Sequence, residues 1–406
     1  MPLLDGLSRV DWSALHHAYG AAVDVPDLLH ALVEPDSAPT ALCAEAKGAR
    51  RDIRDHVEWT LWGNVFHQGT RWQVTATVVP FLVEILRDGP KDDELRRFLI
   101  SYLHHLAIGY PEDTFPDRID PDEAFRALEG KVDPGGEPDY GQDASFGIWA
   151  RDAYLAVEEA IDTIARFIDA DDNESALEAI ALVASFPRCG TKTVPLLREV
   201  ARTRRDQRAA HAVISLAQLV DGDALEDAAH LVASDDRAVA VQAACAVILE
   251  DATRVSNDAI GLLTAPLGDL AGARSTHAGS LSQLVGRCLV LVPGSERERA
   301  MDAIAYQHRD ATPIERVSLS ASLLSLAFAG ERAPDSAAGL TPPQRRAIEA
   351  IRDHGAFVID NAQFTNYALL MREWGLPDSA KGVRDWLEGR EPEAGPTTRS
   401  PWWKLR

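Results

Sequence analysis

The chain has 406 residues, of which 63 are Asp or Glu and 41 are Lys or Arg, so its formal net charge is -22. A field of this sign repels phosphate backbones, which argues against a general nucleic-acid-binding protein. Hydrophobic residues make up 46% of the chain and aromatic residues only 7%. Because Ala, Leu, Val and Ile dominate the hydrophobic share, the composition is typical of packed helices rather than of a sheet sandwich.

The cysteines and the N-terminus indicate a cytoplasmic protein. Cys43, Cys189, Cys245 and Cys288 lie far apart and form no Cys-x-x-Cys pair, so we interpret them as reduced thiols. Residues 1–12 lack a basic region followed by an apolar stretch, which predicts that no secretory signal is present. No apolar run approaches membrane-spanning length, and we therefore expect no membrane partner.

Residues 1–108 are predicted to form atypical N-terminal helical repeats. Trp12, Leu15 and Tyr19 have the spacing of one face of a first short helix, and a second apolar helix begins near Pro26. A third helix is expected over residues 78–86, with Pro80 near its start. The end units of stacked repeats are often irregular, because they must cover an exposed core.

An aromatic segment at residues 59–72 stands out within this part. Large rigid rings alternate there with hydrogen-bonding side chains, a mixture that binding hot spots favour. We predict that its residues contact a partner: Trp59, Trp62, Asn64, His67, Gln68, Arg71 and Trp72. The alternative is that the rings plug the open end of the helical stack while the polar groups satisfy buried backbone.

Residues 109–148 interrupt the helical pattern with many prolines, glycines and acids, and we predict a loop insertion there with a short helix at 122–128. The loop lacks the ligand spacing and closing Glu of a calcium loop. Two interpretations stay open, a solvated acidic loop and a clamp for a basic partner. The candidate clamp residues are Glu112, Asp113, Asp117, Asp120 and Asp122.

Residues 149–390 carry the clearest repeats. Ala179-Ile180, Ala212-Val213 and Ala246-Val247 recur in similar settings at separations of 33 and 34 residues, which is the length of one helix-turn-helix unit. One helix pair cannot bury its own apolar stripe, whereas the next pair covers it. The last segment, residues 391–406, is predicted to be a flexible C-terminal tail.

Helix starts are marked by a short acceptor side chain followed three positions later by Glu or Gln, the capping-box arrangement. Pro313 and Pro342 stand at first helical positions, where a missing N–H costs nothing. The predicted boxes are Ser175/Glu178, Asp223/Glu226, Ser295/Glu298, Thr312/Glu315 and Thr341/Gln344. No segment shows a run of alternating strand residues, so the predicted fold is all-α, an α-α superhelix with the insertion near 109–148.

The repeats at 175–251 resemble bacterial HEAT-repeat proteins, including those whose repeats are named after phycobilisome lyases. The stretch from Trp62 to Trp72, followed by Ala76 to Leu82, also looks like a segment of many members of that group. The resemblance implies a HEAT-like solenoid. Such proteins act as scaffolds, as regulators and as immunity proteins beside secreted toxins, and some HEAT-like proteins are DNA glycosylases or bilin lyases.

We find no dinucleotide fingerprint, no phosphate-binding loop, no nucleophile elbow and no His-Glu-x-x-His helix in the sequence. Adjacent histidines such as His16-His17 and His104-His105 point in different directions on a helix, so neither pair supplies two ligands to one metal. We therefore predict a non-catalytic protein-binding scaffold or adaptor, an inhibitor or immunity protein for a basic effector, with no cofactor and no metal. The alternative is a lyase-like enzyme that binds a small ligand at the N-terminal Trp and His cluster.

Overall fold

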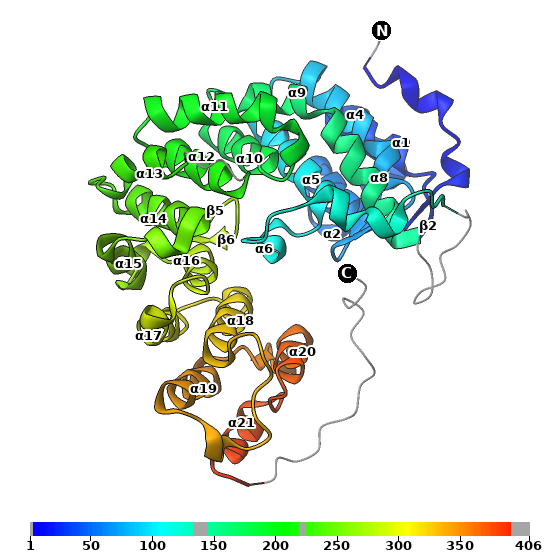
Figure 1. The fold of residues 1–406 in the computed structure, drawn as a ribbon. Coiled ribbons are helices and arrows are strands. Elements are labelled where there is room, and N and C mark those ends of the chain that lie inside the picture. The colour runs from blue at the N-terminus through cyan, green and yellow to red at the C-terminus, as the bar shows by residue number, and fades with distance from the viewer. Residues whose placement is uncertain (1–2, 134–144, 220–223, 391–406) are drawn as a thin grey trace. The chain divides into compact units, whose positions relative to one another are not determined.

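The computed structural model describes residues 3–133, 145–219 and 224–390. Within these ranges the chain forms twenty-one α-helices, several short 3-10 helices and four two-stranded β-hairpins (Figure 1). The helices pack as pairs that follow one another along the chain, which confirms the predicted all-α fold of stacked α-α repeats. The predicted tail at 391–406 lies outside the described residues.

Two compact units divide the chain, Met1–Arg204 and Arg205–Arg406. The predicted segments 1–108 and 109–148 both fall in the first unit, and the predicted segment 149–390 contributes to both units. Among the described residues, no helix is both long enough and apolar enough to cross a membrane.

The helices of the first unit lie in two rows. One row holds α1, α4 and α8, and the other holds α3, α5 and α10, with α1 packed on α3 and α4 packed on α5. The phenol of Tyr102 on α5 donates to the Leu61 carbonyl of α3 at 2.7 Å and joins neighbours of the second row. The helices are α1 (Val25–Val33), α2 (Thr40–Ala49), α3 (Ile53–Asn64), α4 (Thr75–Asp88), α5 (Asp93–Ile108), α6 (Pro111–Thr114), α7 (Pro121–Ala124), α8 (Ser145–Glu159), α9 (Ile161–Ile164), α10 (Asn173–Val183) and α11 (Gly190–Thr203).

The second unit repeats this arrangement more regularly. One row runs through α12, α14, α16, α18 and α20, and a second row runs through α15, α17, α19 and α21 (Figure 1). The helices are α12 (Gln207–Gln218), α13 (Ala224–Val232), α14 (Arg237–Asp251), α15 (Asn257–Thr264), α16 (Leu281–Leu289), α17 (Arg297–Gln307), α18 (Pro313–Phe328), α19 (Pro342–His354), α20 (Thr365–Glu373) and α21 (Ala380–Leu387).

The alanine-rich anchors of the predicted repeats lie in the core. Ala179, Ala212 and Ala246 sit on α10, α12 and α14, and each is buried. A methyl side chain allows neighbouring helix backbones to approach closely, while the adjacent Ile180 and Val213 fill the space between helices. The 33- and 34-residue spacing therefore identified helices that occupy buried positions.

Some predicted helix starts are confirmed and others are shifted. Thr312/Glu315 and Thr341/Gln344 form complete capping boxes, with Pro313 and Pro342 at the first helical position. The predicted box at Ser175 is wrong, because α10 begins two residues earlier and Asp172 accepts from the Ser175 amide at 2.7 Å. Ser295 lies in a 3-10 turn before α17, and Asp223 lies outside the described residues.

Four β-hairpins were not anticipated from the sequence, because strands of two residues are too short to show an alternating pattern. Their bounds are His16–His17 with Gly20–Ala21 (β1, β2), Phe66–His67 with Thr70–Arg71 (β3, β4), Arg274–Ser275 with Gly279–Ser280 (β5, β6) and Val358–Ile359 with Ala362–Gln363 (β7, β8). The predicted helical face of Trp12, Leu15 and Tyr19 is wrong. Trp12 begins a 3-10 turn, and Tyr19 lies at the tip of the first hairpin.

The first two hairpins belong to a duplicated module that the sequence reading missed. In β1–β2, His16 pairs with Ala21, and in β3–β4, Phe66 pairs with Arg71, fifty residues further on. The helices that follow, α1 and α4, begin at Val25 and Thr75, again fifty residues apart. Buried side chains match at the same offset, namely Leu28 with Val78, Leu29 with Val79 and Leu32 with Leu82.

We expect Ile180→Ala or Leu216→Ala to lower the free energy of unfolding by about 2–5 kcal/mol, because each opens a cavity between stacked helices. Both side chains are fully buried. Urea denaturation measures the change. Leu196→Ala is the matched control, because Leu196 on α11 is 43% exposed, and it should cost less than about 0.5 kcal/mol. A loss near zero at both buried sites would contradict the assignment of the core.

Candidate functional site

Trp62 and Trp72 of the predicted 59–72 segment pack against aromatic rings of the first unit. Trp62 makes edge contacts with Phe66, Tyr102 and His105 at ring separations of 5.2, 4.9 and 4.7 Å. Trp72 is buried and stacks on Trp149 of α8 at 6.3 Å. These two rings therefore stabilise the junctions of α3 with α5 and of β4 with α8.

Polar residues of the same segment hold the hairpins in place. The Asn64 side chain donates to Asp24 at 2.8 Å, and the Asn64 carbonyl accepts from the Ala18 amide at 3.0 Å. Asp24 also bonds to the ring of the buried His17 at 2.9 Å. His17 and Asn64 together offset the burial of the Asp24 carboxyl and lower its pKa. Arg71 closes its own hairpin by donating to the Gly69 carbonyl at 2.7 Å.

The tips of the two hairpins lie on the surface. Tyr19, at the tip of β1–β2, is 69% exposed, and its ring meets the edge of His67 at 5.4 Å. Gln68, at the tip of β3–β4, is exposed and has a φ of 50°, a left-handed conformation that non-glycine residues rarely adopt. Of the predicted residues, His67 and Gln68 thus lie at the tips, and Tyr19 joins them although it was not predicted.

The described part of the acidic insertion is held beside the second hairpin at its start and at its end. At its start, Tyr110 contacts Phe66 at 5.4 Å and packs against Gly69 so closely that a Cβ there would lie 3.2 Å from the ring. At its end, Asp133 accepts from the Gln73 amide at 3.0 Å and from the Trp149 indole at 2.8 Å. The structure therefore joins two segments that were predicted as separate sites. We call the tips of β1–β2 and β3–β4 together with residues 109–133 the hairpin–loop surface.

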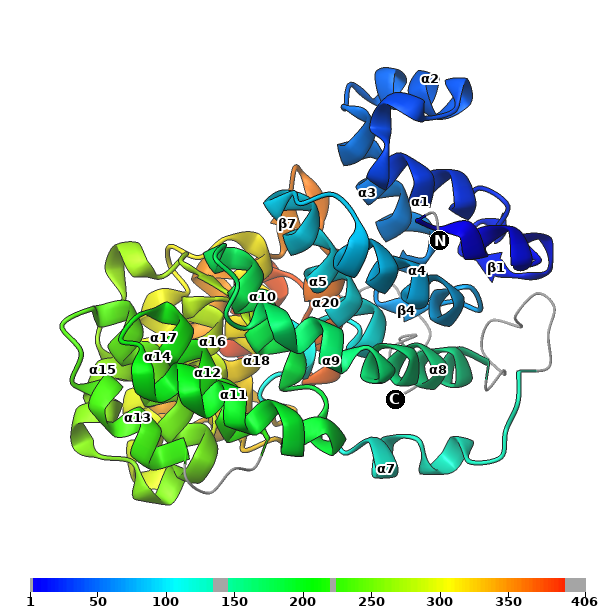
Figure 2. The same ribbon diagram turned by 90° about the horizontal axis from the view of Figure 1, so that it is seen from above.

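Between these ends the insertion lies along α8. The guanidinium of Arg151 donates to the Leu128 carbonyl at 2.8 Å, and Phe125 meets the buried Tyr154 at 5.4 Å (Figure 2). The short helix predicted at 122–128 occurs as α7 followed by a 3-10 turn at Arg126–Leu128. Residues 125–131 of the loop are thus supported by a helix of the stack.

The five predicted acidic residues have different roles in the loop. Asp120 caps α7 by accepting from two backbone amides, and Asp122 forms an ion pair with Arg188. Glu112 and Asp113 lie on α6 beside Tyr110, where burial first and then these carboxylates raise the pKa of the phenol. Asp117 is exposed, as are Glu123 and Glu129 of the same loop.

Trp59 lies apart from the hairpin–loop surface, on the outer edge of α3. It is 62% exposed, and the guanidinium carbon of Arg51 lies 4.1 Å from the centre of its ring. Beside it, Glu58 is half-buried, and its pKa is raised to about 7, first by burial and then by the neighbouring carboxylates, of which Asp55 is the largest contributor. The pattern of residue types did not indicate that Trp59 would be exposed while Trp62 packs against other aromatic rings.

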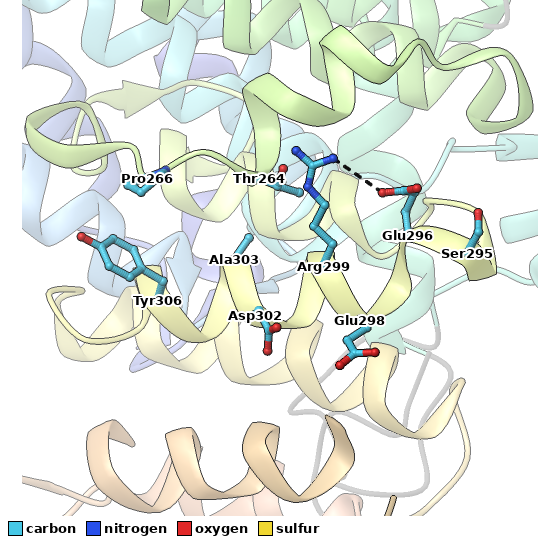
Figure 3. A pocket seen from close by; sticks show the side chains of 9 residues that line it. All are labelled: Thr264, Pro266, Ser295, Glu296, Glu298, Arg299, Asp302, Ala303 and Tyr306. Atoms are coloured by element: carbon cyan, nitrogen blue, oxygen red, sulfur yellow. Dashed lines mark ion pairs between the residues drawn. The ribbon is translucent and has the colours of Figure 1, made fainter. Parts of the chain in front are cut away.

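The second unit contains a groove of about 620 Å³ along α17 that sequence reasoning did not find. Figure 3 shows Arg299 reaching between Thr264 and Glu296, while Tyr306 lies beside Pro266. Arg299 approaches Glu296 at 3.8 Å, and Arg346 of α19 pairs with Glu298 at 2.6 Å and with Asp302 at 3.3 Å. Each carboxylate of the groove thus has an arginine beside it, so the groove is not strongly charged.

Comparison with known proteins adds little to this geometry. No protein-family model matches the chain, and no curated protein matches it. A solved engineered protein from the Northeast Structural Genomics Consortium is similar over 89% of this chain and 98% of its own, at 14% identity and a TM-score of 0.28. Nothing is concluded from a TM-score this low, and the fold assignment depends on the helices of this chain alone.

The raised pKa of Glu58 predicts a pH-dependent stability difference. A carboxyl whose folded pKa lies above its unfolded value binds its proton more tightly in the folded state, so stability falls as pH rises from about 4.5 to 7. Glu58→Gln removes this loss. Because Glu58 is partly exposed, we expect the variant to gain roughly 1 kcal/mol relative to the parent between pH 5 and pH 8.

Urea unfolding of Glu58→Gln and of the parent at pH 5 and at pH 8 gives four free energies of unfolding. The gain is the change, from pH 5 to pH 8, in the difference between the variant and the parent. Glu331→Gln is the control, because Glu331 is an exposed carboxylate of the second unit. An equal pH response of Glu58→Gln and the parent would contradict the assigned shift.

Proposed function

We propose that the chain is a HEAT-like repeat protein, similar to bacterial HEAT-repeat scaffolds, that binds a basic protein partner through the hairpin–loop surface and performs no chemistry itself. The observation that carries this proposal is the position of the negative charge. Residues 109–178 contain 20 Asp or Glu and only 5 Lys or Arg, a net charge of -15 out of -22 for the chain. The charge is therefore concentrated in the insertion and the helices α8 to α10 that follow it.

A concentrated charge acts on a partner before contact. At physiological salt the screening length is about 8 Å, so neighbouring carboxylates act together only when they lie close in space. Such a field raises the association rate of an oppositely charged protein and disfavours partners of like charge. Because Asp117, Glu123 and Glu129 are exposed, they are available to a cationic partner.

The hairpin tips would supply the short-range part of the interface. Tyr19 presents a rigid aromatic ring whose hydroxyl stays in water, the kind of residue that dominates binding energy at protein interfaces. Its base is fixed by the His17–Asp24–Asn64 network, so little conformational freedom is lost on binding. Loops held on a rigid frame commonly carry recognition, and both hairpins meet that description.

An inhibitor or immunity protein for a basic effector is the form of this function that the charge supports best. Covering a cationic active surface requires a large acidic face rather than a deep pocket. The loop is joined to the second hairpin through Tyr110 and Phe66, and to Gln73 just after that hairpin through Asp133, which supports a single continuous contact surface.

The test begins with affinity capture from the native host and continues with binding constants for the recovered partner. We expect Tyr19→Ala to weaken binding by about 30-fold, the equivalent of about 2 kcal/mol for a hot-spot residue. A triple variant, Asp117→Asn with Glu123→Gln and Glu129→Gln, should mainly slow association and reduce its dependence on salt.

The matched control neutralises the same number of exposed carboxylates in the second unit, through Asp258→Asn, Glu331→Gln and Glu373→Gln. We expect this protein to bind as the parent does. The proposal fails if the two triple variants slow association equally and Tyr19→Ala has no effect, because the hairpin–loop surface would then have no special role.

A further inference from the structure

The outer edge of α3 presents an exposed tryptophan among carboxylates. Asp52 caps the helix, and Asp55 and Glu58 follow at intervals of three residues, which places them on one side. Trp59 is four residues after Asp55 and is therefore its neighbour on the helix surface. With 62% of the residue exposed, Trp59 presents a large apolar ring at this edge.

The N-terminal end of α5 adds to the negative charge at this edge. Glu94 is exposed and contributes, with Asp52 and Asp55, to the electrostatic repulsion felt by Glu58. Arg54 and Arg97 are basic residues at this edge, and each already forms an ion pair, Arg54 with Asp92 and Arg97 with Glu94 at 3.8 Å. The edge therefore has more carboxylates than cations, and a further cation would relieve their mutual repulsion.

The chain itself shows which cation the tryptophan accepts. The Arg51 guanidinium lies over the Trp59 ring at 4.1 Å. Burial and the neighbouring Asp52 raise the pKa of Asp55, and the charge of Arg51 partly opposes that increase. A guanidinium can thus stack on the ring while staying close to a carboxylate. A planar guanidinium makes both contacts at once, whereas an ammonium does so less well.

We propose that this edge, formed by Asp52, Asp55, Glu58 and Trp59 of α3 with Glu94 of α5, is a second docking surface that binds an arginine-containing segment of a protein partner. A partner arginine takes the position of Arg51 on the Trp59 ring, and neighbouring basic residues lie against the carboxylates. The inference rests on the proposed function for the existence of a basic partner. It concerns a different surface and can be tested without that partner.

The test uses two synthetic peptides, a twelve-residue Arg-Gly repeat and its Lys-Gly counterpart, titrated into the full chain labelled with 5-fluorotryptophan. Comparison with Trp59→Phe assigns the fluorine resonance of Trp59 among those of the nine tryptophans. We expect this resonance to shift to saturation with the arginine peptide. We expect the arginine peptide to bind about threefold more tightly than the lysine peptide, the size of an exposed cation–π preference.

Variants separate this surface from other acidic parts of the chain. Trp59→Ala should abolish the preference for arginine over lysine, and Trp59→Phe should keep part of it. Arg51→Ala removes the internal competitor and should tighten binding of the arginine peptide by several-fold. Arg9→Ala, which removes an equally positive but distant side chain that is 71% exposed, should change it little.

A Trp59 resonance that does not move while the peptide binds would overturn the inference, because the peptide would then occupy only other acidic surfaces. Equal affinities for the two peptides in the parent protein would overturn it as well. Neither result bears on the hairpin–loop surface, whose own test depends on Tyr19 and the loop carboxylates.

Discussion

The structure depends on one constraint, that no helix pair of this chain can bury its own apolar side. Ala212 on α12 and Ala246 on α14 are buried because the next helix of the row covers them. Some buried histidines of the two units bond to serine side chains. His104 bonds to Ser185 at 2.9 Å in the first unit, and His308 bonds to Ser320 at 2.7 Å in the second. Burial lowers the pKa of each of these histidines to about 3.

The apolar sides of the helices in each row are buried against one another. The proposed binding surfaces are therefore formed by segments that do not belong to these buried sides. In the first unit these are the hairpin tips, the acidic insertion and the outer edge of α3. Each is held by contacts to buried residues, as Tyr110 is by Phe66 and Asp133 is by Trp149. Rigid support reduces the entropy lost on binding, which explains why a stack of plain helices can present specific surfaces.

The sequence predicted the repeats where burial follows a helical period, as at Ala179 and Ala212, and it predicted helix starts where Thr312 and Thr341 cap them. It could not predict hairpins of two residues, which have no period, and so it placed Tyr19 on a helix. It also could not separate Trp59 from Trp62. The two residues lie three positions apart on α3, and they differ because the rings of Phe66, Tyr102 and His105 pack against Trp62. The contact with Tyr102 of α5 joins segments forty residues apart in the chain.

The fifty-residue duplication of hairpin and helix has an evolutionary consequence. In both copies the helix that follows the hairpin has buried side chains, such as Leu28 on α1 and Val78 on α4. Tyr19 and Gln68, at the hairpin tips, are exposed and do not pack in the core. Substitutions at these exposed tips therefore cost little folding stability. The two positions can diverge separately without any change in the packed helices that follow them.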